Sequence, residues 1–97
     1  MTAYVVFQRD ATSDQHALDS YAERADSTFA GHDVEALVDY GALEVLEGPA
    51  IEGVVILRFS DSAAAKAWYF SEQYQQVAKD RFRGSTYRAV LVDGADA

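Results

Sequence analysis

Three segments of this chain carry apolar or aromatic side chains at every position: residues 3–7, 54–57 and 89–92. Their Val, Ile, Tyr and Phe content favours β-strands, whose successive side chains point to opposite faces of a sheet. A sheet with one wet face should alternate apolar and polar residues, and these segments do not. The sequence therefore predicts a sheet that is covered on both faces.

Composition narrows the class of protein. The 97 residues predict one domain, residues 1–97, with 49% hydrophobic and 25% charged side chains, as in a folded globular protein. The 16 acidic and 8 basic residues leave a net charge of −8, which disfavours binding to nucleic acid or to an anionic membrane. Cysteine is absent, so disulfides and thiolate chemistry are excluded. No signal peptide or apolar run of ~18 residues is present, and we expect a cytoplasmic protein.

Strand and helix patterns alternate along the chain. The predicted strands are residues 3–9, 36–47 (interrupted at Gly41), 53–59 and 86–93. The predicted helices begin at three capping residues, Asp14, Asp61 and Ser71. This order predicts an α+β ferredoxin-like βαββαβ fold, an antiparallel sheet with its helices on one face. The other apolar face then needs a second chain, so we expect a homodimer that pairs through the sheet face.

Specific strings resemble a known family: residues 3–7, residues 44–48, and Ala-Trp-Tyr at 67–69 followed by Ser71, Glu72 and Tyr74. Together they resemble the DUF1330 family, small proteins of the dimeric α/β-barrel superfamily, over nearly the whole chain. The resemblance implies a ferredoxin-like subunit that pairs sheet to sheet with a second copy. That superfamily includes cofactor-free monooxygenases, haem-degrading enzymes, isomerases and stress-responsive proteins, so the fold does not select an activity.

The chain departs from the family pattern at two places. Asp39-Tyr40 stands where a basic residue followed by glycine is usual, and Gln73 lies between Glu72 and Tyr74 where the family has Ser-Pro-Glu-Tyr. The positive charge that relatives carry before Gly41 is therefore missing here. An anion-binding role cannot be transferred to Asp39 from the resemblance.

The densest aromatic cluster is Trp68, Tyr69, Phe70 and Tyr74. These rings either pack a helix onto the sheet or line a pocket in which tyrosine hydroxyls orient a small ligand. Arg81 lies on the same helical stripe as Tyr74 and needs a carboxylate partner, from a ligand or from the protein. Glu44 and Glu47 are the internal candidates, and a salt bridge or a solvated guanidinium is the expected outcome.

Other ionisable residues are expected to have structural roles. Three arginines on strands are expected to form cross-strand ion pairs, although each could also anchor a bound acid: Arg9, Arg58 and Arg88. His16 follows a helix cap and should be exposed, whereas His32 lies in a loop that could face a cavity. No histidine and carboxylate group has metal-ligand spacing, so we expect no metal and no cofactor.

Three functions stay open at this point. The first is a small binding module that holds an organic ligand between helices and sheet. Its candidate ligand-binding residues are Trp68, Tyr69, Tyr74, Arg81 and His32. The second is a cofactor-independent monooxygenase or isomerase acting on an activated carbon acid, which needs a base, an oriented substrate and a dry pocket. The third is a purely structural dimer. The sequence assigns no catalytic residue.

Overall fold

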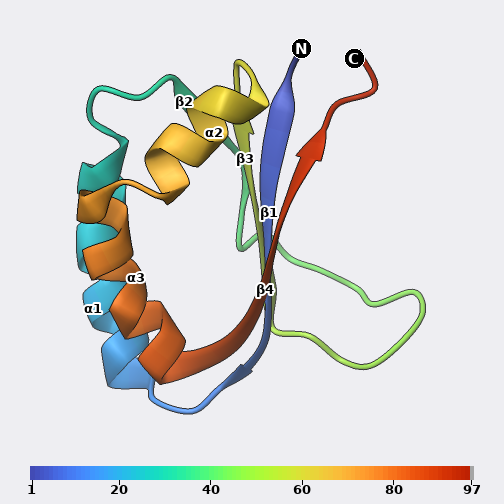
Figure 1. Cartoon of the computed structure of the whole chain (residues 1–97). Helices are drawn as coiled ribbons and strands as arrows, with labels where there is room; N and C mark the ends of the chain where they lie inside the picture. The colour runs from blue at the N-terminus through green and yellow to red at the C-terminus, as the bar shows by residue number, and fades with distance from the viewer. Residues whose placement is uncertain (97) are drawn as a thin grey trace.

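The sheet has four antiparallel strands in the order β2-β3-β1-β4. The computed structural model describes residues 1–96. The elements in chain order are β1 (Ala3–Thr12), α1 (Gln15–Ala25), the 3-10 helix η1 (Asp26–Phe29), β2 (Val34–Asp39), β3 (Gly53–Phe59), α2 (Ser62–Tyr69), α3 (Glu72–Gly84) and β4 (Ser85–Asp93). The helices all lie on one face of the sheet (Figure 1). This is the predicted ferredoxin-like α+β fold.

Each predicted capping residue begins a helix. A side-chain oxygen of Asp14, Asp61 and Ser71 accepts a hydrogen bond from the backbone N–H three residues later, at 3.3, 2.7 and 3.1 Å. These bonds satisfy N–H groups that have no partner inside the helix. The cap at Ser71 separates α2 from α3, so the interruption expected in the second helical region is confirmed.

The long strand predicted for residues 36–47 is wrong beyond Asp39. β2 ends there because Tyr40 has a φ of 57°, in the left-handed region, which turns the chain out of the sheet. Residues 41–50 are all exposed, and the loop that contains them projects beyond the sheet on the side away from the helices (Figure 1). Its Leu43, Val45 and Leu46 side chains are therefore in water.

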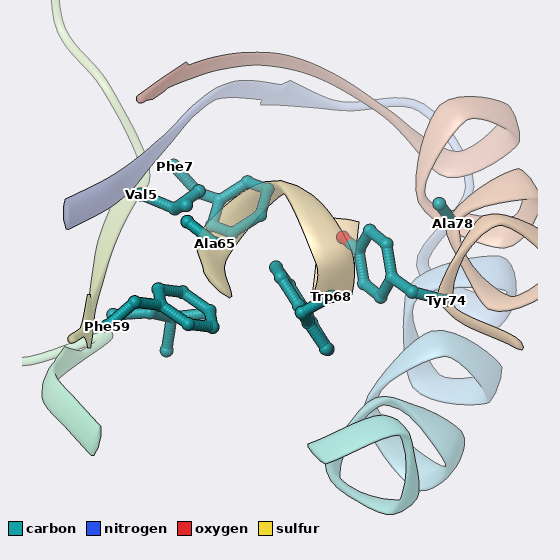
Figure 2. Packing of buried hydrophobic residues seen from close by; sticks show 8 residues of the cluster. Val5, Phe7, Phe59, Ala65, Trp68, Tyr74 and Ala78 are labelled. Atoms are coloured by element: carbon teal, nitrogen blue, oxygen red, sulfur yellow. The ribbon is translucent and has the colours of Figure 1, made fainter. Parts of the chain in front are cut away.

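The core lies between the helices and the sheet and is centred on Trp68. This residue is 1% exposed, and its indole Nε1–H donates to Thr28 Oγ1 at 3.0 Å. The ring centroid lies 4.1 Å from that of Tyr74 and 5.7 Å from that of Phe59. Figure 2 shows the indole between these two rings, one from α3 and one from β3. Trp68 thus joins both layers of the fold.

The sheet face away from the helices, called the open face below, is apolar at its centre. Val6 of β1 pairs with Ile56 of β3 and Val90 of β4, and Ile56 pairs with Val38 of β2. Paired residues share a face, so four aliphatic side chains form one row across the sheet. Val90 is 46% exposed in the single chain. The sheet is thus apolar on both sides at its centre, and on the open face the next row carries the Arg58–Glu35 ion pair.

Asp80 fastens α3 to α1. Its side chain is almost fully buried and accepts hydrogen bonds from Ser20 Oγ at 2.9 Å and Arg83 Nη2 at 2.6 Å, and it pairs with Arg24 of α1. The hydrogen bond from Ser20, together with the two arginines, holds the pKa of Asp80 below its ordinary value of 3.8. The carboxylate therefore stabilises the fold where it is ionised.

We expect Asp80→Asn to lower the melting temperature at pH 7, because the two arginines lose their anion. A lowered pKa contributes stability above the pKa of the unfolded chain, and this contribution is lost as the pH falls through the folded-state pKa. The difference in melting temperature between wild type and variant, measured by circular dichroism, should therefore become smaller from pH 7 to pH 3. Asp93→Asn removes an exposed carboxylate as the control. A gap that stays constant over this pH range would contradict the assignment.

Candidate functional site

A cavity of about 290 Å³ lies between α1 and the helix-facing side of the sheet. Its walls come from every helix and strand, and its apolar surface is provided largely by Phe7, Leu18, Phe29, Val55, Leu57 and Trp68. The volume corresponds to roughly ten water molecules and lies at the lower end of the range for small-molecule sites. The cavity can therefore hold a compact organic molecule.

Arg81 reaches the cavity from α3 and is 3% exposed. The guanidinium carbon lies 5.0 Å from the ring centroids of Phe7 and Tyr87 and 4.8 Å from that of Phe82. Burial opposes its charge, but the neighbouring Tyr74 and Tyr21 favour it, and the pKa of Arg81 stays above its ordinary value. The side chain is therefore a permanent cation inside the protein.

Two pairs of tyrosine hydroxyls lie beside this cation. Tyr21 Oη and Tyr74 Oη are 2.8 Å apart, and the Tyr40 hydroxyl bonds that of Tyr87. Burial, followed by the bond or charge of the partner tyrosine, raises the pKa values of Tyr21 and Tyr40. Burial also raises the pKa of Tyr74. These phenols remain neutral near pH 7 and act as hydrogen-bonding groups rather than as bases.

Tyr40 closes one end of the cavity. Its ring lies under the Arg9 guanidinium, 5.0 Å from the guanidinium carbon, and against Gly53. A Cβ atom at residue 53 would lie 2.5 Å from the Tyr40 ring, so glycine at this position leaves the space that the ring occupies. Arg9 pairs with Gly53 on one side and Tyr87 on the other. The Tyr40 ring therefore covers a row of three strand residues.

The predicted site residues separate into groups. Trp68 and Arg81 line the cavity, and Tyr74 lies behind the wall, where its hydroxyl reaches the lining residue Tyr21. Tyr69 lies in a second cavity, of about 300 Å³, between α2 and β4. His32 is half-buried in the turn after η1, outside the lining of both cavities.

Sequence reasoning missed three lining tyrosines: Tyr21, Tyr40 and Tyr87. Tyr21 lies three residues after Leu18 in α1, a spacing that indicates a core-facing side chain, and the sequence gives no sign that its hydroxyl faces a cavity. Tyr40 follows β2 and Tyr87 lies in β4, and these two strands form opposite edges of the sheet. Only the folded chain shows that their hydroxyls meet.

The structure settles most of the expected ion pairs. Arg58 Nε lies 2.8 Å from Glu35 of β2, so its expected cross-strand pair is confirmed, and Arg9 Nε lies 3.1 Å from Glu52, the residue before β3. The cross-strand pair expected for Arg88 is wrong, because Arg88 forms no ion pair among residues 1–96. The internal salt bridge proposed for Arg81 is wrong. Glu44 and Glu47 lie in the exposed loop after β2, and Arg81 forms no ion pair within residues 1–96.

Two further observations limit what the described chain can do. Residues 1–96 contain no cluster of three or more His, Asp or Glu side chains placed to hold a metal ion. Among the same residues, the helices are too short or too polar to cross a lipid bilayer. The lining of the cavity offers arginines, phenols, exposed carboxylates, the Gln15 amide and apolar side chains.

Solved structures with the same fold include proteins of different descriptions. A protein of unknown function from Rhodopseudomonas palustris has a TM-score of 0.73 at 19% identity, covering 96% of this chain and 82% of the other. A dimeric ferredoxin-like protein of unknown function from Jannaschia sp. has a TM-score of 0.70 at 12% identity, covering 97% and 100%. SnoaB, a cofactor-independent oxygenase from Streptomyces nogalater, has a TM-score of 0.58 at 13% identity, covering 99% and 94%.

At these identities the structural neighbours establish the fold and no shared activity. No curated protein matches the sequence. A family profile matches residues 2–95, which is nearly the whole chain and includes every strand and helix around the cavity. The chain therefore belongs to the family described as a domain of unknown function, DUF1330.

Proposed function

We propose that this protein binds a small organic molecule in the cavity between α1 and the sheet. The observation that carries the proposal is a partly open, largely apolar cavity whose lining includes a buried cation and three tyrosines. A pocket of this kind, apolar with a few placed polar groups, is typical of small-molecule sites. Side chains of a purely structural core would be expected to fill such a space.

A cofactor-independent oxygenase is the second candidate, favoured by the structural likeness to SnoaB. Such an enzyme needs a base that can take a proton from the substrate near neutral pH. The lining within residues 1–96 contains no histidine, burial keeps its tyrosines Tyr21 and Tyr40 protonated, and its carboxylates are exposed ones: Asp19, Asp26 and Asp39. Binding is therefore the better-supported function. The test is to add a phenolic carbon acid to the protein in aerated buffer and measure oxygen uptake. Uptake by the wild type that a cavity-filling variant abolishes would support the oxygenase instead.

We also propose a homodimer that pairs through the open face. The apolar row of Val38, Ile56, Val6 and Val90 gives this face a surface suited to burial against a second copy. The loop after β2, with its exposed Leu43 and Leu46, projects on the same side (Figure 1). The Jannaschia neighbour is described as dimeric, which supports a homodimer. Two such sheets facing each other would form a dimeric α/β barrel.

Narrowing the cavity tests the binding function. Ala22 of α1 lies at the exposed edge of the cavity, and Ala22→Leu adds three carbon atoms there, which narrow the entrance while keeping a good helix former. Trp68 is the chain's single tryptophan and also lines the cavity, so its fluorescence should report occupancy. We expect benzoate or benzyl alcohol to change that fluorescence in the wild type, with affinity about tenfold weaker in the variant.

The matched control is Ala63→Leu, which adds the same atoms to an exposed position of α2 outside the cavity. It should bind the probes as the wild type does. Equal binding by the wild type and Ala22→Leu would place the probes elsewhere. If neither probe alters Trp68 fluorescence in the wild type, the binding proposal fails and the structural dimer becomes the better description.

A further inference from the structure

Arg81 lines the cavity, and behind that lining two nitrogen atoms of its guanidinium are unsatisfied. Nε and Nη2 are buried, and within residues 1–96 they donate no hydrogen bond. Native structures rarely leave buried polar atoms without a partner, and a buried charge is especially costly unless it is paired. A missing partner at this depth therefore points to a group that binds there.

The residues around Arg81 compensate its charge only in part. The rings of Phe7, Phe82 and Tyr87 attract the cation through their faces at 4.8 to 5.0 Å. These rings accept no strong in-plane hydrogen bond from the guanidinium edge. The neighbouring acid on α3, Asp80, is already bonded to two other arginines and a serine. No acidic side chain among residues 1–96 forms an ion pair with Arg81.

The two unsatisfied atoms define the shape of the missing partner. Nε and Nη2 lie along one edge of the planar guanidinium and direct two parallel N–H bonds away from it. A carboxylate matches this edge with its two oxygen atoms, which gives a bidentate, charge-assisted pair. A hydroxyl would match only one of the two donors, and an amine would bring a second positive charge.

The rest of the cavity sets the orientation of such a ligand. Leu18, Phe29 and Leu57 offer apolar surface for its body. The acidic residues of the lining are exposed ones, Asp19, Asp26 and Asp39. They disfavour an anionic group near the exposed part of the lining, whereas Arg81 favours it inside. The charged end of the bound ligand should therefore lie deepest, at Arg81.

We propose that the ligand of this cavity is a small organic monocarboxylic acid with an apolar body, whose carboxylate binds the guanidinium of Arg81 and turns its Nε–Nη2 edge to the cavity. This inference rests on the proposed binding function and names the ligand class for the same site. It also accounts for the aromatic rings around the guanidinium, which hold the side chain in place and keep water away from the pair. Arg81 is thus the specificity-determining residue of the site.

Three probes of similar shape and different charge test the inference: benzoate, benzyl alcohol and benzylamine. Each is titrated at pH 7 into the full-length protein, with Trp68 fluorescence as the readout. Two charge-assisted hydrogen bonds predict that benzoate binds about 10- to 100-fold more tightly than benzyl alcohol, and benzylamine most weakly. In ¹H–¹⁵N spectra, the Nε–H resonance of Arg81, assigned by its loss in Arg81→Met, should shift with benzoate and not with benzyl alcohol.

Two variants separate the charge from the shape of Arg81. Arg81→Met keeps much of the stem and should lose about the same 10- to 100-fold of benzoate affinity while binding benzyl alcohol normally. Arg81→Lys keeps the charge without the planar edge and should fall between Arg81→Met and the wild type. Lys79→Met removes an exposed charge from the same helix and should leave all three affinities unchanged.

The outcomes distinguish the two proposals. If benzyl alcohol binds as tightly as benzoate, or Arg81→Met leaves benzoate affinity unchanged, the cavity binds ligands but Arg81 does not recognise a carboxylate. If none of the three probes binds the wild type, the binding function fails and this inference with it. Should Arg81→Met not fold, the comparison of probes on the wild type and on Arg81→Lys still decides the question.

Discussion

Replacing Trp68 with alanine is expected to lower the free energy of unfolding by about 3–5 kcal/mol. The indole is 1% exposed, contacts rings from the sheet and from α3, and donates a buried hydrogen bond to Thr28. Alanine would leave a cavity at the junction of the two layers and an unsatisfied acceptor on Thr28. The whole free energy of unfolding of a small domain is only about 5–15 kcal/mol, so the variant should be close to unfolding. Urea unfolding followed by circular dichroism measures the loss.

Phe70→Ala is the matched control for this prediction. Phe70 also carries a large aromatic ring and lies two residues further along, but it is 68% exposed. Its removal should change the free energy of unfolding by less than about 0.5 kcal/mol. If Trp68→Ala cost no more than Phe70→Ala, the core would not be centred on the indole.

Replacing Ile56 with lysine should convert the proposed dimer into a folded monomer. Ile56 lies in the middle of the open face, between Val6 and Val38. In a sheet-to-sheet dimer two unpaired lysines would be buried at the contact, which should raise the dissociation constant by about two to three orders of magnitude. In the monomer the same side chain reaches water, so the fold should survive. Sedimentation velocity at micromolar concentration measures the mass, and circular dichroism checks the fold.

Ser60→Lys adds the same charge at the exposed end of β3 and should remain dimeric. Two results would overturn the arrangement. A wild-type protein that sediments as a stable monomer at micromolar concentration would leave the apolar row in water. If the Ile56→Lys protein stays dimeric, the interface must lie on another surface.

The sequence predicted the fold well where local signals agree with the final packing. The caps at Asp14, Asp61 and Ser71 and the two-sided strands around Val6 and Ile56 depend on neighbours in sequence or on alternation along a strand. The error at residues 40–47 has a different origin. Leu43 and Val45 alternate as in a strand, but a strand also needs a paired neighbour, and Tyr40 turns the chain away from β3 before these residues are reached.

The site was predictable only in outline. Aromatic clustering and helical spacing identified Trp68 and Arg81, which do line the cavity. The same reasoning could not show that the aromatic cluster divides, with Tyr69 facing the second cavity. It also assigned Arg81 a salt bridge or a solvated position, because spacing along a helix does not report how deeply a long side chain is buried. Depth and missing partners are properties of the packed chain.

Tyr40 and Gly53 have a consequence for how relatives vary. The ring at residue 40 needs the space left by glycine at residue 53, so the two positions should change together across homologous chains. In a relative with glycine at position 40, the left-handed backbone would be unstrained, but the ring that closes this end of the cavity would be missing. Position 53 could then carry a side chain. The cavity of such a relative would extend past β2 toward solvent and admit longer molecules. Under the proposed binding function, the residues at these two positions should therefore vary with the length of the ligand.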